Sequence, residues 1–320
     1  EATVTDANVF LGRLNAEALL GGKMPIRSDL SAACIDSLAR KLGVTTDAAA
    51  LGIVNVACAR MVKAIRAISV ERGHSPRDFV LFVYGGAGPL HATDVARDLG
   101  IGRIVVPPNP GILCAEGAMN APLSVEFVRT ILAPLDAGNA GVLREASAVL
   151  GRQVEEWFAR EEVPAAQRRT AWTVGARYVG QNYELTLPLE LSLDDRAMAA
   201  DMAEKFHAAH ETSYGFAARS EPIQIVNLAV KALGMLEIAD LPQFEPAEPG
   251  LPRELRETLF AGTTRVSTPV FDREALTPGH VIVGPAIIEQ MDTTVLVFPG
   301  DSCAVDRWGN LVIDVRETVR

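Results

Sequence analysis

The sequence is short of cysteine and of positive charge. Its 320 residues include four cysteines, Cys34, Cys58, Cys114 and Cys303, with no C-x-x-C pair among them. Reduced thiols in a cytoplasmic protein are therefore expected, rather than a zinc site or a disulfide framework. Lysine and arginine number 30 against 40 aspartates and glutamates, a formal net charge of −10. This balance argues against nucleic acid or an anionic membrane surface as a partner.

A long apolar run and an ordinary start are missing as well. No uninterrupted apolar run approaches the roughly 20 residues that a membrane helix needs, so no membrane association is expected. The chain begins Glu1-Ala2-Thr3-Val4-Thr5, without an initiating Met or a signal-like basic flank, and we expect it to be a fragment of a longer protein. With 48% hydrophobic residues, it can bury a large core in two or three domains.

The most informative stretch is an apolar segment that breaks on glycines and continues as an amphipathic one. Phe79–Tyr84 is continuously apolar and predicts a strand buried on both faces of a mainly parallel sheet. The loop that follows is Gly85, Gly86, Ala87 and Gly88, and Pro89 suits the first helical position. Glycines allow positive φ and a close ligand approach, and free amides at a helix start favour an anion or a polarisable ring. The loop is thus a candidate ligand site, although close packing alone would also use such glycines.

Several titratable side chains are candidates for chemistry. His91 falls in the first turn of the predicted helix, where the dipole favours its neutral form. It could orient a ligand, accept a proton or bind a metal with Asp6, or it could simply cap the loop. Asp6, Asp94 and Glu116 could assist a metal–nucleotide complex, with Asp94 expected to face solvent. His207 and His210 are three apart on a predicted helix, but without a third ligand nearby we expect ordinary helix residues.

The order of predicted elements indicates an α/β fold with additional parts. Residues 1–132 read as an α/β lobe with strand, loop and helix in alternation. Residues 133–240 predict an α+β unit with two antiparallel strands around Gly180 and Gln181. Residues 241–252 carry four prolines and two glutamates and predict a linker. Residues 253–320 have short strands and turn signals, which predict a small β-rich C-terminal domain.

Several blocks of this sequence resemble the hydantoinase A and 5-oxoprolinase family. The glycine block is Tyr84–Ala92, and the other blocks are Thr3–Asn8, Val106–Pro108 with Pro110–Gly111, Arg177–Gln181, Tyr183–Leu185, Tyr214–Gly215 and Gly284–Glu289. Effectively the whole chain is covered, in the family's order. An ordered match of several blocks is far more specific than the glycine loop alone.

The resemblance implies a fold and a cofactor. The family's fold is similar to that of sugar kinases, Hsp70 and actin, with two lobes around ATP and Mg²⁺. By the resemblance, this chain is the carboxy-terminal half of the subunit and contains the second lobe. By the resemblance, Gly85 to Gly88 would be the adenosine-side loop of that lobe. From the residues themselves, Pro89 and Asp6 are further candidates for cofactor binding, and His91 is the candidate catalytic residue. The amino-terminal lobe, with its Asp-x-Gly-Gly-Thr phosphate loop, is absent from this sequence, so the chain alone is expected to be inactive.

The resemblance also implies a choice of reactions. Family members hydrolyse cyclic amides such as hydantoins or 5-oxoproline with ATP, usually beside a hydantoinase B-type subunit or domain, and we expect the same here. The same-family alternative is the ATP-using subunit of an acetone- or acetophenone-type carboxylase. The alternative from another class is a non-catalytic assembly subunit. Pro122 and Ser124 stand where the family pattern predicts an Asp and a basic residue, which bears on the identity of the substrate.

Overall fold

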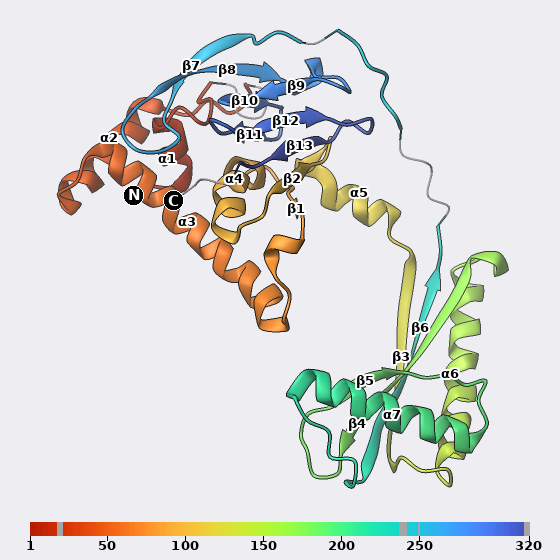
Figure 1. The fold of residues 1–320 in the computed structure, drawn as a ribbon. Coiled ribbons are helices and arrows are strands. Elements are labelled where there is room, and N and C mark those ends of the chain that lie inside the picture. The colour runs from red at the N-terminus through yellow and green to blue at the C-terminus, as the bar shows by residue number, and fades with distance from the viewer. Residues whose placement is uncertain (18–21, 237–241, 249, 317–320) are drawn as a thin grey trace. The chain divides into compact units, whose positions relative to one another are not determined.

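The computed structural model describes residues 1–17, 22–236, 242–248 and 250–316. Its fold is mixed α/β, and the chain divides into two compact units (Figure 1). Unit 1 is Glu1–Ala118 together with Asp240–Arg320, and unit 2 is Met119–Ala239. Short 3₁₀ turns, η1 to η5, occupy Val70–Arg72, Pro76–Asp78, Pro110–Ile112, Ala165–Gln167 and Arg273–Ala275.

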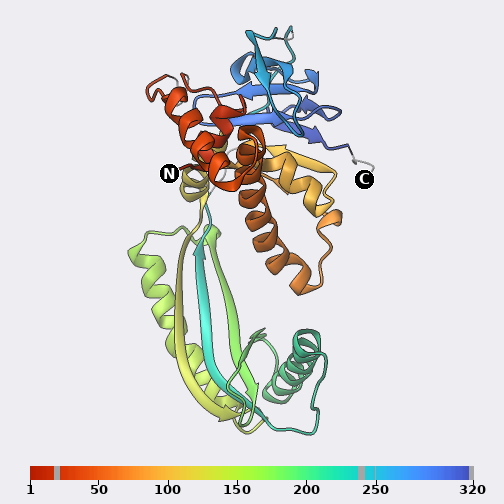
Figure 2. The same cartoon turned by 90° about the vertical axis from the view of Figure 1, so that its left-hand side faces the viewer.

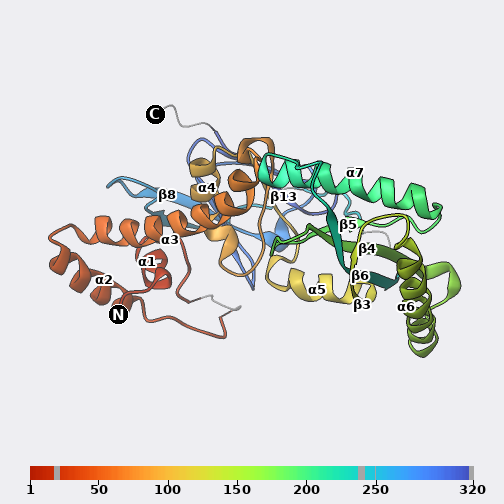
Figure 3. The ribbon, with the colours of Figure 1, turned by 90° about the horizontal axis from the view of Figure 1, so that it is seen from below.

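Unit 1 begins with three helices that pack against one another: α1 (Val4–Phe10), α2 (Ser28–Leu42) and α3 (Thr46–Ser69) (Figure 3). The hydroxyl of Thr3 accepts the Asp6 amide and the Asp6 carboxylate accepts the Thr3 amide, which makes a capping box for α1. Helix α2 ends at Gly43 with φ of 68°, and Thr45 caps α3. At both ends the cap satisfies backbone groups that helix ends leave free: the Gly43 amide donates to the Ala39 and Arg40 carbonyls, and the Thr45 hydroxyl accepts the Ala48 amide.

Two sheets complete unit 1. The first has the order β1 (Leu81–Phe82), β2 (Arg103–Val106), β13 (Leu311–Asp314), β12 (Ser302–Val305), β9 (Val281–Val283). The second has the order β11 (Thr294–Val297), β10 (Ala286–Glu289), β8 (Val266–Asp272), β7 (Glu254–Thr258). Strand β1 is parallel to β2, and helix α4 (Gly88–Leu99) connects them. One core cluster contains apolar side chains of α3, α4 and both sheets.

The predicted strand Phe79–Tyr84 is wrong in its extent and in its burial. Strand β1 covers only Leu81 and Phe82, and Phe79, Val80 and Tyr84 are about half exposed. The physical reason is position, because β1 is the edge strand of its sheet and has only β2 beside it. An apolar run predicts a strand, but it does not distinguish an edge from the centre of a sheet.

The compact units divide the chain differently from the expected domains. Strand β13 pairs antiparallel with β2, with Leu311 opposite Val106 and Ile313 opposite Ile104. The predicted C-terminal domain 253–320 therefore completes the sheet of the predicted lobe 1–132. The boundary between this part and the α+β unit falls at residue 119 rather than 133. In the predicted linker 241–252, residues 241 and 249 lie outside the described residues.

Unit 2 is an antiparallel sheet with two helices. The strands β3 (Leu123–Pro134), β6 (Ile223–Gly234), β4 (Arg168–Tyr178) and β5 (Leu185–Pro188) lie side by side in that order (Figure 2). Helices α6 (Ala140–Arg160) and α7 (Asp195–Tyr214) pack on the sheet, and α5 (Leu113–Asn120) precedes it. The core combines inward side chains of α6, α7, β4 and β6, among them Phe158, Met202, Val174 and Leu228. The antiparallel pairing of β4 and β5 is as predicted.

Helix α3 is long and apolar enough to cross a membrane by length and composition, as judged among the described residues. The absence of uninterrupted apolar runs did not predict this. The observation is weak, because core helices of soluble proteins meet the same criterion. One face of α3, with Ala50, Val54 and Cys58, is packed in the core of unit 1.

Candidate functional site

Three loops of unit 1 are held together by hydrogen bonds. They are the glycine loop after β1, the loop 107–111 after β2, and the turn 290–293 between β10 and β11. The Gly85 amide donates to the Pro110 carbonyl at 2.7 Å. The Thr293 hydroxyl donates to the Gly86 carbonyl at 3.0 Å, and the Gly111 amide donates to Asp292 Oδ2 at 2.8 Å. Two of these bonds join residues 207 and 181 positions apart, so the three loops form one wall.

The glycines of this wall serve different purposes. Gly85 has φ of 86°, a conformation that glycine adopts at little cost. Gly86 and Gly88 do not have positive φ, contrary to the prediction for all three. A Cβ atom on Gly86 would lie 3.1 Å from the Asp292 carbonyl oxygen, and one on Gly111 would lie 2.3 Å from Asp292 Oδ2. At position 111 the close approach of the turn 290–293 leaves no room for a Cβ atom, and at position 86 a Cβ atom would make a tight contact with that turn.

The wall borders a cavity of about 550 Å³, here called the loop pocket. Gly86, Ala87, Leu90 and His91 line it, whereas Gly85, Gly88 and Pro89, which were also expected at a ligand, are not among its lining residues. Its other lining residues come from α1 and the following turn, from residues 253, 272 and 274, and from residues 289 to 294. The lining includes four carboxylates and one arginine: Asp272, Glu274, Glu289, Asp292 and Arg253. The carboxylate of Glu289 accepts hydrogen bonds from Arg253 and Arg256.

His91 is a buried, neutral member of this pocket. Its side chain is 5% exposed, and burial, followed by the nearby Arg13 charge, lowers its pKa. Its Nδ1 lies 3.8 Å from Cys58 Sγ. Burial raises the pKa of the Cys58 thiol to about 12, so this thiol stays protonated and is a poor nucleophile. His91 can therefore present a neutral ring to a ligand.

The acidic residues singled out from the sequence are not part of the loop pocket. Asp6 caps α1 and accepts the Ser31 hydroxyl at 2.7 Å. Burial acts to raise its pKa, but the hydrogen bonds from Ser31 and Thr3 outweigh burial and lower it. Asp94 does not face solvent freely as predicted, because its carboxylate lies 3.3 Å from the buried Arg13 guanidinium. Glu116 accepts the Asn109 side-chain amide at 2.8 Å.

The two histidines of α7 are engaged in packing. His207 Nδ1 lies 2.9 Å from the Tyr178 hydroxyl, which also accepts the Ala218 amide. His210 Nδ1 donates to the Phe216 carbonyl at 2.7 Å. Across the described ranges, no group of three His, Cys, Asp or Glu side chains could hold a metal ion.

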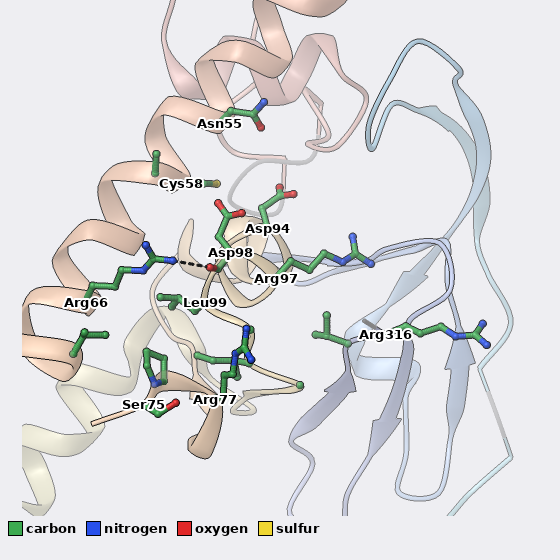
Figure 4. A pocket seen from close by; sticks show the side chains of 17 residues that line it. Asn55, Cys58, Arg66, Ser75, Arg77, Asp94, Arg97, Asp98, Leu99 and Arg316 are labelled. Atoms are coloured by element: carbon green, nitrogen blue, oxygen red, sulfur yellow. Dashed lines mark hydrogen bonds between the residues drawn. The ribbon is translucent and has the colours of Figure 1, made fainter. Parts of the chain in front are cut away.

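A second cavity of unit 1, of about 1170 Å³, contains several arginines (Figure 4). Arg66 donates to the Asp98 carbonyl at 3.0 Å, and Arg97 binds both carboxylate oxygens of Asp301. Arg97 and Arg316 project away from Arg66 and Arg77 (Figure 4). Because the guanidinium groups diverge, this cavity does not form a common anion site, and the loop pocket is the better candidate.

Sequence reasoning did not single out four residues that shape the loop pocket: Asn8, Gln290, Asp292 and Thr293. Asn8 lies in one family block, and the other three follow directly after the block Gly284–Glu289. A signal was present, because the turn Gln290–Thr293, with three polar residues out of four, separates the apolar segments of β10 and β11. A polar turn between buried strands is where a binding residue is commonly placed.

Comparison with known proteins supports the resemblance. The sequence matches the hydantoinase/oxoprolinase family over residues 1–126 and the hydantoinase/oxoprolinase C-terminal domain over residues 136–316. It is 35% identical to an uncharacterized protein of Methanocaldococcus jannaschii, over 98% of this chain and 44% of that protein. It is 30% identical to caprolactamase subunit alpha of Pseudomonas jessenii, over 96% of this chain and 45% of that protein. It is 28% identical to 5-oxoprolinase 1 of Arabidopsis thaliana, over 98% of this chain and 26% of that protein.

Solved structures show the same similarity. The ATP-dependent caprolactamase from Pseudomonas jessenii matches with a TM-score of 0.84 and 28% identity, over 98% of this chain and 47% of that one. Nucleotide-free acetone carboxylase matches in fold with a TM-score of 0.77 and 24% identity, over 99% of this chain and 46% of that one. The chain spans less than half the length of these proteins. With nearly all of its residues matched in the family's order, the chain belongs to the hydantoinase/oxoprolinase family.

Proposed function

We propose that this chain forms part of an ATP-dependent hydrolase of cyclic amides. The observation that carries the proposal is the loop pocket, because three separate family blocks meet there: Thr3–Asn8, Tyr84–Ala92 and the segment that begins at Gly284. The similarity to an ATP-dependent caprolactamase supports it.

In this proposal, unit 1 is the second lobe of an actin-, Hsp70- and sugar-kinase-like fold. The glycine loop lies on the adenosine side of the nucleotide. The order of strand β1, loop Gly85–Ala87 and helix α4 supports this. Gly86 lines the pocket and, as a glycine, has no side chain to fill it. Such a loop admits a flat ring close to the main chain.

The role of ATP would be to phosphorylate the amide oxygen, which turns a poor electrophile into a good one. The residues of this chain would bind and orient the reactants. The neutral His91 ring would pack against a ligand or accept one hydrogen bond, and the wall of Gly86, Ala87 and Thr293 would exclude water from one side.

The pocket fits a nucleotide base better than a triphosphate. Its four carboxylates outnumber its one arginine, and carboxylates repel phosphate oxygens. Within the described ranges there is no three-residue acidic or histidine cluster for Mg²⁺. The phosphates and Mg²⁺ would therefore be held by a lobe outside this sequence. One relative is called a subunit alpha, so a hydantoinase B-type partner is part of the proposal.

The second candidate function is the ATP-using subunit of a carboxylase of ketones. It is favoured by the fold similarity to acetone carboxylase. A non-catalytic assembly subunit would keep the fold and lack turnover.

The test is ATP hydrolysis by the whole protein, purified with its partner subunit. Caprolactam, 5-oxoproline and hydantoin are added separately, and acetone is added with bicarbonate. Stimulation by a cyclic amide supports the proposal, and stimulation that requires acetone and bicarbonate supports the carboxylase. Gly86→Val should abolish the stimulated rate, because its side chain would enter the space beside the Asp292 carbonyl and the pocket. Nucleotide binding without stimulation by any substrate would favour an assembly subunit.

A further inference from the structure

Arg273 is a buried cation near the loop pocket to which the proposed function assigns no role. It follows β8, and its two neighbours, Asp272 and Glu274, line the pocket, whereas Arg273 is not among the lining residues. The residue is 8% exposed. Burial, as the largest effect, lowers its pKa to about 10, so the guanidinium is still charged at neutral pH. A charge that stays buried needs compensating contacts, because removing it from water costs free energy.

The guanidinium binds backbone carbonyls of two separate segments. Its Nη2 donates to the Pro107 carbonyl at 3.1 Å and to the Gly309 carbonyl at 2.8 Å. The second acceptor belongs to the turn 306–310, which is closed by its own hydrogen bonds. Arg273 therefore fastens the loop 107–111 to a turn that is itself held in place.

The loop 107–111 depends on outside donors, because three of its five residues are prolines. Proline has no N–H, so the donors that its carbonyls meet decide where this loop lies. These donors come from three distant segments: Arg273 for Pro107, the Gln290 side chain for Pro108, and the Gly85 amide for Pro110. The last two donors belong to the wall of the loop pocket. Arg273 supplies the anchor from outside the pocket.

The bonding of Arg273 favours placement of the loop over stability as its role. Its Nη1 is buried and has no hydrogen-bond partner among the described residues, which is costly for a charged donor. An apolar side chain of similar length would fill the same space without that cost. It would not supply the donor that fixes the Pro107 carbonyl.

We propose that Arg273 is a positioning residue for the loop pocket, and that it sets the glycine loop and the turn 290–293 through the loop 107–111. This inference rests on the proposed function, in which the glycine loop lies against a ligand. Two backbone amides of the wall, at Gly85 and Gly111, transmit the effect, because both donate hydrogen bonds between the loop 107–111 and its neighbours. Without Arg273 the loop shifts, and the wall loses the geometry that these bonds require.

The first measurement is hydrogen exchange on the whole protein carrying Arg273→Met, which removes the donor and keeps the length of the side chain. Exchange should accelerate about tenfold or more at the Gly85 and Gly111 amides, and by a smaller factor at the amides of β2 and β13. A role in stability alone would accelerate the strand amides equally. Arg273→Lys returns a charged donor of different shape and should give an intermediate acceleration.

The second measurement is amide-stimulated ATP hydrolysis by the same proteins, each purified with its partner subunit. Arg273→Met should raise the KM for ATP about tenfold or more and change kcat less, because the displaced wall binds the ligand and does not react with it. The matched control is Arg144→Met in unit 2, where the guanidinium also donates to two loop carbonyls, those of Leu191 and Leu193. The control should leave the KM for ATP and the exchange of the wall amides unchanged.

The outcomes separate this inference from the proposed function. The inference is overturned if the wall amides of Arg273→Met exchange as in the wild type or accelerate only as much as the strand amides. An unchanged KM for ATP, with a wild type that cyclic amides stimulate, also overturns it. Selective acceleration at Gly85 and Gly111, with a wild type that no cyclic amide stimulates, would retain the inference and refute the proposed function. If Arg273→Met does not fold, Arg273→Lys decides by the same criteria.

Discussion

Gly111→Ala tests whether the turn 290–293 and the loop 107–111 form one rigid wall. Gly111 does not have positive φ, so alanine meets no backbone strain. Its Cβ would instead lie 2.3 Å from Asp292 Oδ2 and 2.8 Å from Asp292 Cβ. Rotation of the Asp292 side chain cannot relieve the contact with its own Cβ, so the turn itself must shift. That shift breaks the bond between the Gly111 amide and Asp292.

The magnitude follows from that bond and from the substitution. A hydrogen bond to a charged group contributes about 1.5–3 kcal/mol, less at this exposed position. Replacing glycine also reduces the entropy of the unfolded chain, which offsets about 0.4–1 kcal/mol. We expect a net loss of about 1 kcal/mol in the free energy of unfolding. Because Asp292 moves, the affinity for the pocket ligand should fall about tenfold or more.

The assay is urea unfolding combined with calorimetry of adenosine binding. The matched control is Gly117→Ala in α5, where nothing lies within 4 Å of the added methyl group and alanine favours the helix by about 0.5–1 kcal/mol. Hydrogen exchange at the Gly111 amide reports the bond directly and should accelerate in Gly111→Ala. A Gly111→Ala protein with wild-type stability and wild-type exchange at residue 111 would refute the rigid wall.

Three other predictions address unit 1 and unit 2. Arg13→Met should lower the free energy of unfolding by about 3–5 kcal/mol in urea, because the guanidinium is 1% exposed and its loss removes the ion pair with Asp94 and leaves the buried Leu259 carbonyl without its donor. A loss of free energy below about 1 kcal/mol would mean that solvent compensates. His91→Gln should weaken the pH dependence of the free energy of unfolding. In the folded protein the pKa of His91 lies below the ordinary value of 6.5. As the pH falls, the unfolded chain therefore takes up the proton first, and the wild type loses stability below about pH 6.5. Equal pH profiles from pH 7.5 to 5 would contradict that reasoning, and the same variant should reduce turnover more than ATP affinity. Tyr178→Phe should lower the free energy of unfolding by about 1–3 kcal/mol, because it leaves His207 Nδ1 and the Ala218 amide without their partner. The control Tyr183→Phe, at a side chain 77% exposed, should change the free energy of unfolding very little.

The helices and their ends could be predicted from the sequence. Glycine at position 43, threonine at position 45 and the apolar spacing within residues 140–160 are local patterns that favour the elements found in the structure. The glycine loop between β1 and α4 is equally local. Such features depend on residues within a few positions of one another, so periodicity and capping chemistry suffice.

The sheet order and the site depended on tertiary structure. Nothing near Leu311 in the sequence indicates that it pairs with Val106, and this pairing makes the C-terminal strands part of unit 1. Asn8, His91 and Asp292 lie far apart in the chain, and only folding brings them to one pocket. Local patterns record the backbone's preference for a helix or a strand. Which strands pair and which polar groups remain unpaired is decided by contacts between distant residues, and a single sequence does not record them.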